Sequence, residues 1–471
     1  MKLLKPLAVY LLTVLLAGGA IFTLIELGNS LPGPQIAAAA PEASLWAALL
    51  ANLNHPLSHL FVQLLVIIAV ARVVGAIFAR YGLQAVVGEM FAGILLGPSL
   101  FGWLWPDAFA FVFPGESMGA LRLLSQVGIC LFMFSIGMEL NLSHARNKAP
   151  TAVAVSHASI VVPFVMGVAL AYFLFVDFAG PSATFVGFAL FMGISMSITA
   201  FPVLARILQE RGMLRTPLGS TAVTCAAVDD VTAWSILAFV VAIVRSTSLG
   251  GSVLALALVG VVLVVMTLIV RPALPRWLGH QRLTETEPSS STLGIVVCVL
   301  LASALSTEVI GIHALFGAFL AGTVMPDVEG FRDRIRARVE KFSSALLLPL
   351  FFAFTGLRTE IGSLEGAHGW LLCLLIILIA TVGKLGASAV AARITGMKWN
   401  ESLQLGALMN TRGLMELIAL NIGYDLGILS PPIFTMLVIM ALVTTFMTGP
   451  LLTLLNRKSA QVPTDGAYSP R

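Results

Sequence analysis

Long apolar runs separated by short polar segments repeat along the whole chain. A transmembrane helix needs about 20 apolar residues to cross a hydrocarbon layer of about 30 Å, and it satisfies its own backbone hydrogen bonds there. The pattern therefore predicts an all-α polytopic membrane protein with an N-terminal span and about thirteen core spans. The expected spans are residues 7–27, 57–79, 84–104, 119–140, 149–176, 183–208, 217–244, 252–270, 292–305, 313–325, 342–356, 369–392, 402–422 and 431–455.

The composition excludes a soluble domain. Of the 471 residues, 58% are hydrophobic and only 11% are charged. The four cysteines lie far apart in apolar runs, which suits packed helices better than disulfides or a metal site. The net charge of +4 is no nucleic-acid footprint, because the basic residues lie in short segments between spans. With no phosphate loop or nucleophile–base pair apparent, we expect no enzyme chemistry, no cofactor and no nucleic-acid partner.

The charge of the connecting segments alternates across the predicted membrane. One set is basic, whereas the opposite set holds little beyond Arg122, Arg245 and Arg358. Because basic loops favour the cytoplasm, this bias predicts that both termini are cytoplasmic. The basic set comprises Lys2, Lys5, Arg80, Arg146, Lys148, Arg211, Arg215, Arg271, Arg276, Arg282, the stretch 332–341, Arg393, Lys398, Arg457 and Lys458.

This topology defines three regions. Residues 1–55 are expected to form an N-terminal span with an external linker, 56–455 the membrane domain and 456–471 a short cytoplasmic tail. The N-terminal segment also has the charged start, apolar run and small-residue stretch of a signal peptide, so cleavage remains an alternative. The basic stretch 325–342 (MPDVEGFRDRIRARVEKF) is expected to be an amphipathic turn or short helix on the membrane surface. No appended regulatory domain is expected.

The two halves of the membrane domain contain similar segments in the same order. Residues 91–100 (FAGILLGPSL) align with 316–325 (FGAFLAGTVM), and one span later Gly137 aligns with Gly356. The aligned spans are an odd number of helices apart, so the halves have opposite orientations in the membrane. Inverted repeats are typical of transporters, which bind substrate at the midplane on interrupted helices. The expected repeats are 56–245 and 291–455, joined by a linking helix at 251–271.

Corresponding spans of the two repeats carry helix-breaking signals. Pro202 lies inside the span 183–208, where it removes a backbone donor. Asn410, Thr411, Arg412 and Gly413 interrupt the span 402–422, and a guanidinium within a membrane span needs a partner or an aqueous cavity. Both spans are therefore predicted to be broken.

Asp229 and Asp230 lie side by side in an otherwise uncharged stretch, residues 217–244. Each carboxylate in the middle of the bilayer costs about 3 kcal/mol. Adjacent helical residues point about 100° apart, so one acid can face a protein partner while the other faces a cavity. Because neighbouring carboxylates disfavour each other's ionisation, the pair is expected to take up a proton near physiological pH. The alternative is a structural helix–helix contact.

Other charged residues within spans have two readings each. Lys384 is the expected counter-ion of one aspartate, or a lysine that reaches the interface. Arg412 and Glu416, one turn apart, either pair with each other or neutralise the ends of the broken helices. Glu89 lies in an entrance or caps its helix, and Glu139, near a span end, is expected at the membrane interface.

Five motifs in this order resemble the monovalent cation:proton antiporter-2 family, including its Kef-like and plant CHX-like branches. The resemblance covers roughly residues 56–455 and implies two crossing broken helices in a core domain that moves against a dimerisation domain. The motifs are GEMFAGILLGPS, SITAFPVLARIL, AAVDDVTAW, GIHALFGAFLAG and NTRGLMELIALNIG.

The resemblance also implies roles for individual residues. Asp230 matches the main cation and proton carrier, and Asp229 matches the acid that pairs with a membrane lysine, here Lys384. Thr199 falls in the first unwound segment, which supplies oxygen ligands, and Thr411 and Arg412 fall in the second. Many Kef-like and CHX-like relatives have Asn or Gln where Asp229 stands, so this chain departs from them, and the choice between Na⁺ and K⁺ stays open.

The sequence therefore predicts an antiporter that exchanges protons for Na⁺ or K⁺ by alternating access at Asp230. With two acids, more than one proton per cation is expected, and transport would then generate current. The alternatives are a cation channel or uniporter on the same scaffold and a non-transporting membrane sensor. The expected setting is a homodimer in the bilayer of a bacterial inner membrane.

Overall fold

The structure is a computed structural model that describes residues 4–29, 52–53, 55–81, 85–139, 149–214, 216–245, 249–364 and 366–460. The chain divides into two units, Met1–Ser58 and His59–Arg471, and each is described by itself. Across these ranges the regular structure is helical, and the β contact found there is one isolated bridge between Ala179 and Leu429. The predicted all-α class is confirmed.

The first unit contains helix α1, Leu4–Asn29. Its 26 residues extend about 39 Å, enough to cross a hydrocarbon layer of about 30 Å. From Leu12 to Gly28 its side chains are exposed, as in a helix surrounded by lipid. Most of the expected linker after this span lies outside the described residues.

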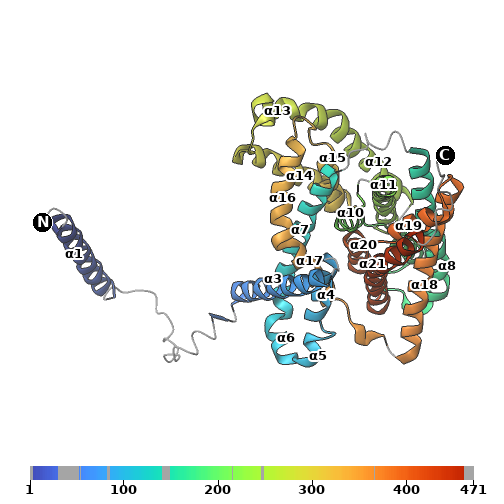
Figure 1. The fold of residues 1–471 in the computed structure, drawn as a ribbon. Coiled ribbons are helices and arrows are strands. Elements are labelled where there is room, and N and C mark those ends of the chain that lie inside the picture. Colours follow the sequence, from blue (N-terminus) through green and yellow to red (C-terminus); the bar gives the residue numbers. More distant parts are fainter. Residues whose placement is uncertain are drawn as a thin grey trace, which may run out of the picture. The chain divides into compact units, whose positions relative to one another are not determined.

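The helices of the second unit follow the predicted spans closely (Figure 1). Their bounds are α3 Pro56–Arg80, α4 Ala85–Leu96, α5 Phe101–Leu104, α6 Pro106–Val112, α7 Met118–Glu139, α8 Ala149–Phe178, α9 Phe185–Ser197, α10 Phe201–Glu210, α11 Pro217–Arg245, α12 Leu249–Val264, α13 Arg271–Thr284, α14 Ser290–Ile310, α15 Ala314–Thr323, α16 Phe331–Phe342, α17 Leu348–Leu357, α18 Gly366–Ile394, α19 Trp399–Met409, α20 Leu414–Asp425 and α21 Pro431–Ala460.

Within the described ranges, 11 segments are long and apolar enough to cross a membrane. The other predicted spans are α1, which counts as a shorter apolar helix, the interrupted pair α19 and α20, and α15. The ten residues of α15 extend only about 15 Å, half of a bilayer core. The predicted span 313–325 is therefore a short helix and does not cross by itself.

Two basic segments are more helical than the sequence suggested. Residues expected to form a loop after 270 continue as α13, reached through a π-helical turn at Val265–Val270 and kinked at Gly279. Within the stretch 325–342, residues 331–342 form an amphipathic helix, α16, with Phe331 and Ile335 on its buried face. It continues through the π-turn Ser343–Leu347 into α17, so it belongs to the helical body.

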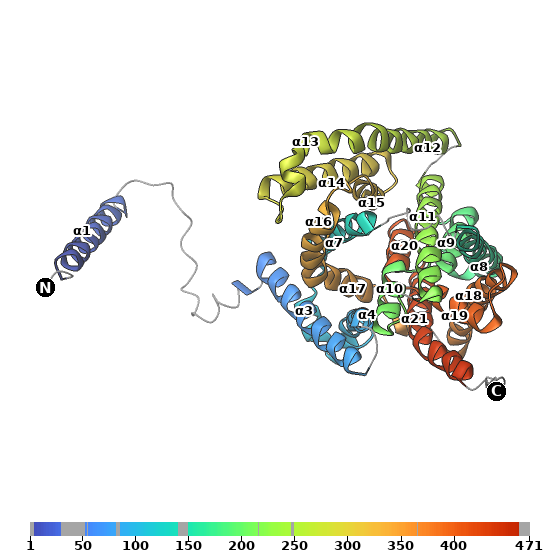
Figure 2. The ribbon, with the colours of Figure 1, turned by 45° about the horizontal axis from the view of Figure 1, so that its top comes forward.

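The helices of the second unit gather into two groups (Figure 2). One group, named here the core group, contains α8–α11 and α18–α21, whose main packing contacts are with each other. The other, the scaffold group, contains α3–α7 and α14–α17, where α4 packs on α17 and α7 packs on α15. Both groups mix helices from the two expected repeats, which is how an inverted repeat builds two interlocked bodies.

The glycines aligned between the repeats contact each other in exchanged pairs. A Cβ atom on Gly97 would lie 2.4 Å from the carbonyl oxygen of Gly356, and one on Gly322 would lie 2.9 Å from the Cα of Gly137. Gly97 aligns with Gly322 and Gly137 with Gly356, so the α4–α17 contact is repeated as the α15–α7 contact. A two-fold relation between the repeats requires this exchange.

Gly356→Ala is expected to destabilise the protein, because the added methyl group would meet the backbone carbonyl of Gly93 at 2.0 Å. Overpacking between two backbones costs about 1–3 kcal/mol or more. We expect a lower unfolding midpoint in detergent than for Gly386→Ala, where no atom lies within 4 Å. Equal midpoints for the two variants would contradict the close approach of α4 and α17.

Candidate ion-binding site

Helices α9 and α10 are two halves of one interrupted span. Residues 198–200 between them are extended, with Ala200 at φ −94° and ψ 96°. Pro202 has no N–H to donate to the carbonyl of Ile198, so the helical ladder cannot pass this point. Pro202 instead occupies the first turn of α10, where a missing donor costs nothing.

Helices α19 and α20 form the second interrupted span, with a non-helical segment at residues 410–413. The two breaks contact each other directly. The amide of Ala200 donates to the carbonyl of Thr411 at 3.0 Å, and the hydroxyl of Thr199 donates to the carbonyl of Met409 at 3.1 Å. The structure therefore contains the two broken helices that the sequence predicts, crossing at their unwound segments.

Two buried cations meet the free carbonyl end of α9. Arg412 donates to the carbonyl oxygens of Ser195 and Met196 at 2.5 and 2.7 Å. Lys384 donates to the carbonyl of Ser197, the last residue of the helix. Because the C-terminal end of a helix carries partial negative charge, both cations are placed favourably. Arg412 also pairs with Glu416 at 3.0 Å. It therefore both forms an ion pair with Glu416 and neutralises the end of a broken helix.

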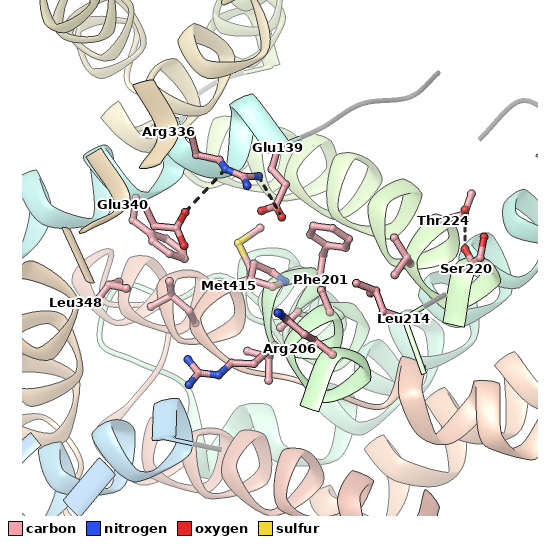
Figure 3. Close-up of a pocket in the computed structure, with 18 of the residues that line it drawn as sticks. Glu139, Phe201, Arg206, Leu214, Ser220, Thr224, Arg336, Glu340, Leu348 and Met415 are labelled. Atoms are coloured by element: carbon pink, nitrogen blue, oxygen red, sulfur yellow. Dashed lines mark hydrogen bonds and ion pairs between the residues drawn. The ribbon is translucent and has the colours of Figure 1, made fainter. Parts of the chain in front are cut away.

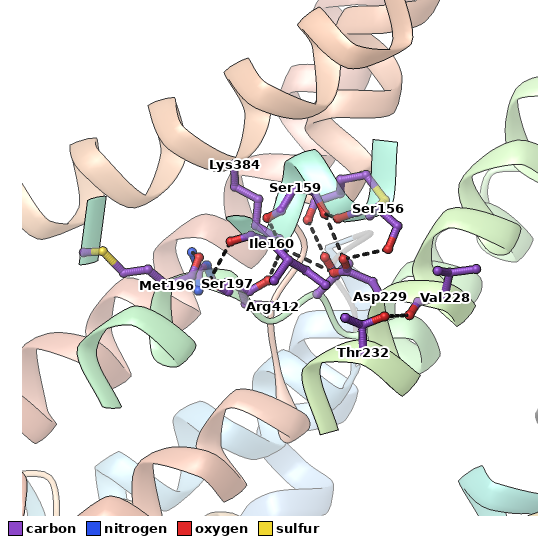
Figure 4. A network of polar contacts seen from close by, with 12 residues as sticks. Ser156, Ser159, Ile160, Met196, Ser197, Val228, Asp229, Thr232, Lys384 and Arg412 are labelled. Atoms are coloured by element: carbon purple, nitrogen blue, oxygen red, sulfur yellow. Dashed lines mark hydrogen bonds and ion pairs between the residues drawn. The ribbon is translucent and has the colours of Figure 1, made fainter. Parts of the chain in front are cut away.

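Asp229 is held by three donors at the centre of a buried network (Figure 4). The hydroxyl of Ser159 donates to its carboxylate at 2.8 Å, that of Ser156 at 3.3 Å, and the Lys384 ammonium lies 3.3 Å away. Lys384 donates in addition to the carbonyl of Ser159 at 3.1 Å. The network thus joins α8, α9, α11 and α18 around one charge pair.

Asp230 has the opposite environment. Its side chain is fully buried, and neither carboxylate oxygen has a hydrogen-bond partner among the residues that the structure describes. The first backbone amide of α10, that of Phe201, is a neighbouring donor that lacks the geometry of a full hydrogen bond, and Lys384 lies within electrostatic range. A buried carboxylate without hydrogen bonds is costly, so its presence points to a ligand that it receives.

A cavity of about 990 Å³ opens between the core and scaffold groups and ends at the first break (Figure 3). Ala200, Phe201 and Pro202 are among its lining residues, and the backbone of Phe201 neighbours Asp230 on α11. At its mouth, Arg336 lies 3.5 Å from Glu139 and 3.9 Å from Glu340. The cavity therefore reaches the segment of the first break that neighbours the carboxylate.

The opposite end of the same gap is closed by a cluster of charged residues, named here the seal. Arg358, at the end of α17, pairs with Asp425 at 2.6 Å and donates to Asn421 at 2.9 Å, both near the end of α20. Arg122 on α7 reaches Asp425 at 3.2 Å. The guanidinium of Arg358 also stacks over Phe354 at 4.2 Å. Core and scaffold are thus apart at the cavity and joined at the seal.

The remaining predicted residues lie in different places. Thr411 is buried in the second break, and its hydroxyl lies 3.3 Å from that of Thr448. Glu89 pairs with Arg72 at 3.3 Å and is not among the residues that line the cavity. Sequence reasoning missed Ser156 and Ser159, and it gave no sign that Glu139, expected at the membrane interface, lines the cavity mouth.

Two crossing broken helices around buried carboxylates, reached from one side by a cavity, define a secondary transporter. Residues 65–458 match the family described as "Sodium/hydrogen exchanger, transmembrane". The match covers most of the chain, so the chain belongs to this family; it is a transporter of the cation/proton antiporter class and not an enzyme.

The chain is similar over its membrane domain to several antiporters. It is 42% identical over 390 residues to the Na(+)/H(+) antiporter NhaS4 of Synechocystis sp., covering 83% of this chain and 95% of that one. It is 38% identical to Cation/H(+) antiporter 20 of Arabidopsis thaliana over 84% of this chain, which spans about half of that longer relative (48%). Its fold resembles the sodium proton antiporter MjNhaP1 from Methanocaldococcus jannaschii, with a TM-score of 0.62, 15% identity, and coverage of 84% of this chain and 99% of that one.

Proposed function

We propose that this chain exchanges protons for Na⁺ or K⁺ across its membrane, with Asp230 holding the two cargoes in turn. The observation that carries the proposal is the fully buried Asp230 carboxylate without a hydrogen-bond partner in the described chain, next to a cavity and a pair of crossed broken helices. Similar proteins are named for Na⁺ and, in the yeast K(+)/H(+) antiporter 1, for K⁺. Either ion therefore fits the proposal.

Because proton and cation bind one carboxylate, they compete, and this competition couples the two fluxes. The unwound segment with Thr199 supplies backbone and hydroxyl oxygens, the hard ligands that an alkali cation prefers. Asp229 and Lys384 form a buried ion pair beside this site. With two acids, more than one proton moves per cation, and transport generates current. Arg412, Thr411 and Glu416 keep the crossed breaks in place throughout the cycle.

Alternating access follows from motion of the core group against the scaffold group. In this proposal the cavity faces the cytoplasm, because Arg336 of the basic helix α16 and Arg206 of α10 line it. The termini are then cytoplasmic as well, the membrane is a bacterial inner membrane, and the scaffold group forms the contact of a homodimer. The repeats at 56–245 and 291–455 are the structural basis of the motion.

Purified protein in vesicles that contain a pH-sensitive dye tests the function. We expect an inward gradient of Na⁺ or K⁺ to make the lumen alkaline, and the response to persist when the membrane potential is clamped. Measuring Na⁺, K⁺ and Li⁺ in turn, with and without the clamp, gives the preferred cargo and shows whether exchange generates current. Vesicles without protein provide the background rate.

A cation channel or uniporter on this scaffold would give a different result. It would carry the cation without protons, so lumenal pH would stay constant under a clamped potential while tracer cation entered. A sensor would show no flux of either kind. Family membership does not favour these alternatives.

A further inference from the structure

The seal has a counterpart at the cavity end, because the repeats place equivalent residues at both ends of the gap. Gly137 and Gly356 occupy equivalent positions in α7 and α17, as their exchanged contacts with Gly322 and Gly97 show. Two residues after these glycines stand Glu139 and Arg358. Arg358 is the central residue of the seal, and Glu139 lines the mouth of the cavity. The equivalent positions therefore carry opposite charges.

The ends of α10 and α20 fix the register of the facing wall. Gly212 and Gly427 follow these helices with left-handed φ angles of 64° and 67°. The amide after each glycine then closes the same bond: Met213 donates to Leu208 at 2.8 Å, and Ile428 donates to Gly423 at 3.0 Å. Because α10 and α20 are the second halves of corresponding broken spans, we use these matching ends to set the register between them.

In this register, two of the α20 residues that Arg358 contacts have counterparts on α10 that line the cavity. Asn421, which accepts a hydrogen bond from Arg358, corresponds to Arg206, and Tyr424, over which Arg358 also stacks, corresponds to Gln209. Arg206 and Gln209 both line the cavity, and Arg206 lies across it from Glu139 (Figure 3). At the seal, Arg358 donates to Asn421. At the cavity end the equivalent positions are exchanged in character: an acid, Glu139, faces an arginine, Arg206.

We propose that the opposite-facing state closes this cavity by pairing Glu139 with Arg206, as Arg358 pairs with Asn421 and Asp425 at the closed end of the present structure. The inference rests on the proposed alternating access. In the present state Glu139 pairs with Arg336, which lies on the same side of the cavity, and Arg206 interacts electrostatically with Glu89. Closing the cavity exchanges these contacts for one across the gap while the seal opens. Each end then holds one ion-pair cluster that forms only when the other breaks.

Charge reversal tests the pair. Glu139→Arg and Arg206→Glu are each expected to slow cation-driven proton movement about tenfold or more, because like charges would then face each other in the closed cavity. The double variant is expected to recover to within about threefold of the wild type. Glu340→Arg provides the matched control, because Glu340 lines the same mouth but contacts Arg336 on its own side of the cavity, whereas the proposed pair crosses the gap. We expect this control to exchange within about threefold of the wild type.

A second measurement does not depend on transport or on the charge-reversed proteins. Cysteines at positions 139 and 206, in a chain whose native cysteines are replaced, are joined with a short bismaleimide in membranes. We expect cross-linking that increases when Arg358→Ala is added, since loss of the seal favours the opposite-facing state. A double charge reversal as slow as the slower single variant, or a cross-link that Arg358→Ala does not increase, would overturn the pairing. Absence of exchange in the wild-type protein would instead refute the proposed function and leave the cross-link as the measure of closure.

Discussion

The Asp230→Asn protein is expected to insert and fold but to exchange protons for cations no faster than vesicles without protein. Asparagine has nearly the shape of aspartate, but it cannot carry a proton in exchange for a cation. Because Asp230 lacks hydrogen bonds within the described chain, the substitution removes a buried charge without leaving a partner unpaired. The unfolding midpoint in detergent should therefore stay the same or rise. Substitutions that remove a functional group often stabilise a protein in this way.

The measurement combines the pH-sensitive dye in vesicles with thermal unfolding in detergent. Asp177→Asn is the matched control, because Asp177 is an exposed carboxylate near the end of α8. It should exchange at the wild-type rate. In the wild type, raising the proton concentration should raise the cation concentration needed for half-maximal exchange, since the two compete for one carboxylate. Wild-type exchange by Asp230→Asn would exclude the carrier role.

Asp229→Asn should lower the unfolding midpoint, in contrast to Asp230→Asn, even though the two residues are adjacent. That substitution leaves the Lys384 ammonium without its carboxylate in a fully buried network, and an uncompensated buried charge is strongly destabilising. The two adjacent acids thus separate into one that holds the structure together and one that is left available. Their separation follows from the 100° between neighbouring helical side chains.

Much of this arrangement could be predicted from the sequence because it depends on local signals. Apolar runs locate the helices, Pro202 locates the first break, and the polar run from Asn410 to Gly413 locates the second. Lys384 and Asp229 are charged residues within apolar spans, where charges are rare. Their pairing could therefore be predicted from their scarcity and opposite sign. In the structure Nζ of Lys384 lies 3.3 Å from Oδ2 of Asp229. Their roles in transport stay predictions.

The parts that could not be predicted depend on tertiary structure. Ser156 and Ser159 carry no charge, and serines are common where membrane helices pack closely, so nothing in α8 marks them as partners of Asp229. Glu139 stands at the end of a span, where an interfacial acid is ordinary. It lines a cavity only because the scaffold and core groups stand apart at that end. The basic stretch of α16 likewise becomes part of the mouth through its continuation into α17.

Arg412 could be located from the sequence, but its contacts depend on tertiary structure. It lies in the second break and stabilises the first break. Its guanidinium reaches across to Ser195 and Met196 at the end of α9, while its own helix supplies Glu416. All of these groups are buried. The crossing of the broken helices is therefore held by a side chain from one half of the sequence on backbone atoms of the other.

Arg412→Gln is expected to be the most destabilising single substitution at the site, by about 3–5 kcal/mol, because it strands the Glu416 carboxylate and leaves two helix-end carbonyls without their cation. Glu416→Gln should cost less, since Arg412 keeps both carbonyls and a neutral acceptor beside it. The double variant should be more stable than Arg412→Gln alone, because no buried carboxylate remains unpaired. Unfolding midpoints of the three proteins, measured with Glu401→Gln at the exposed start of α19 as the control, decide the order. If Glu416→Gln proved as costly as Arg412→Gln, the ion pair alone would stabilise the crossing, and the contacts with the end of α9 would contribute nothing.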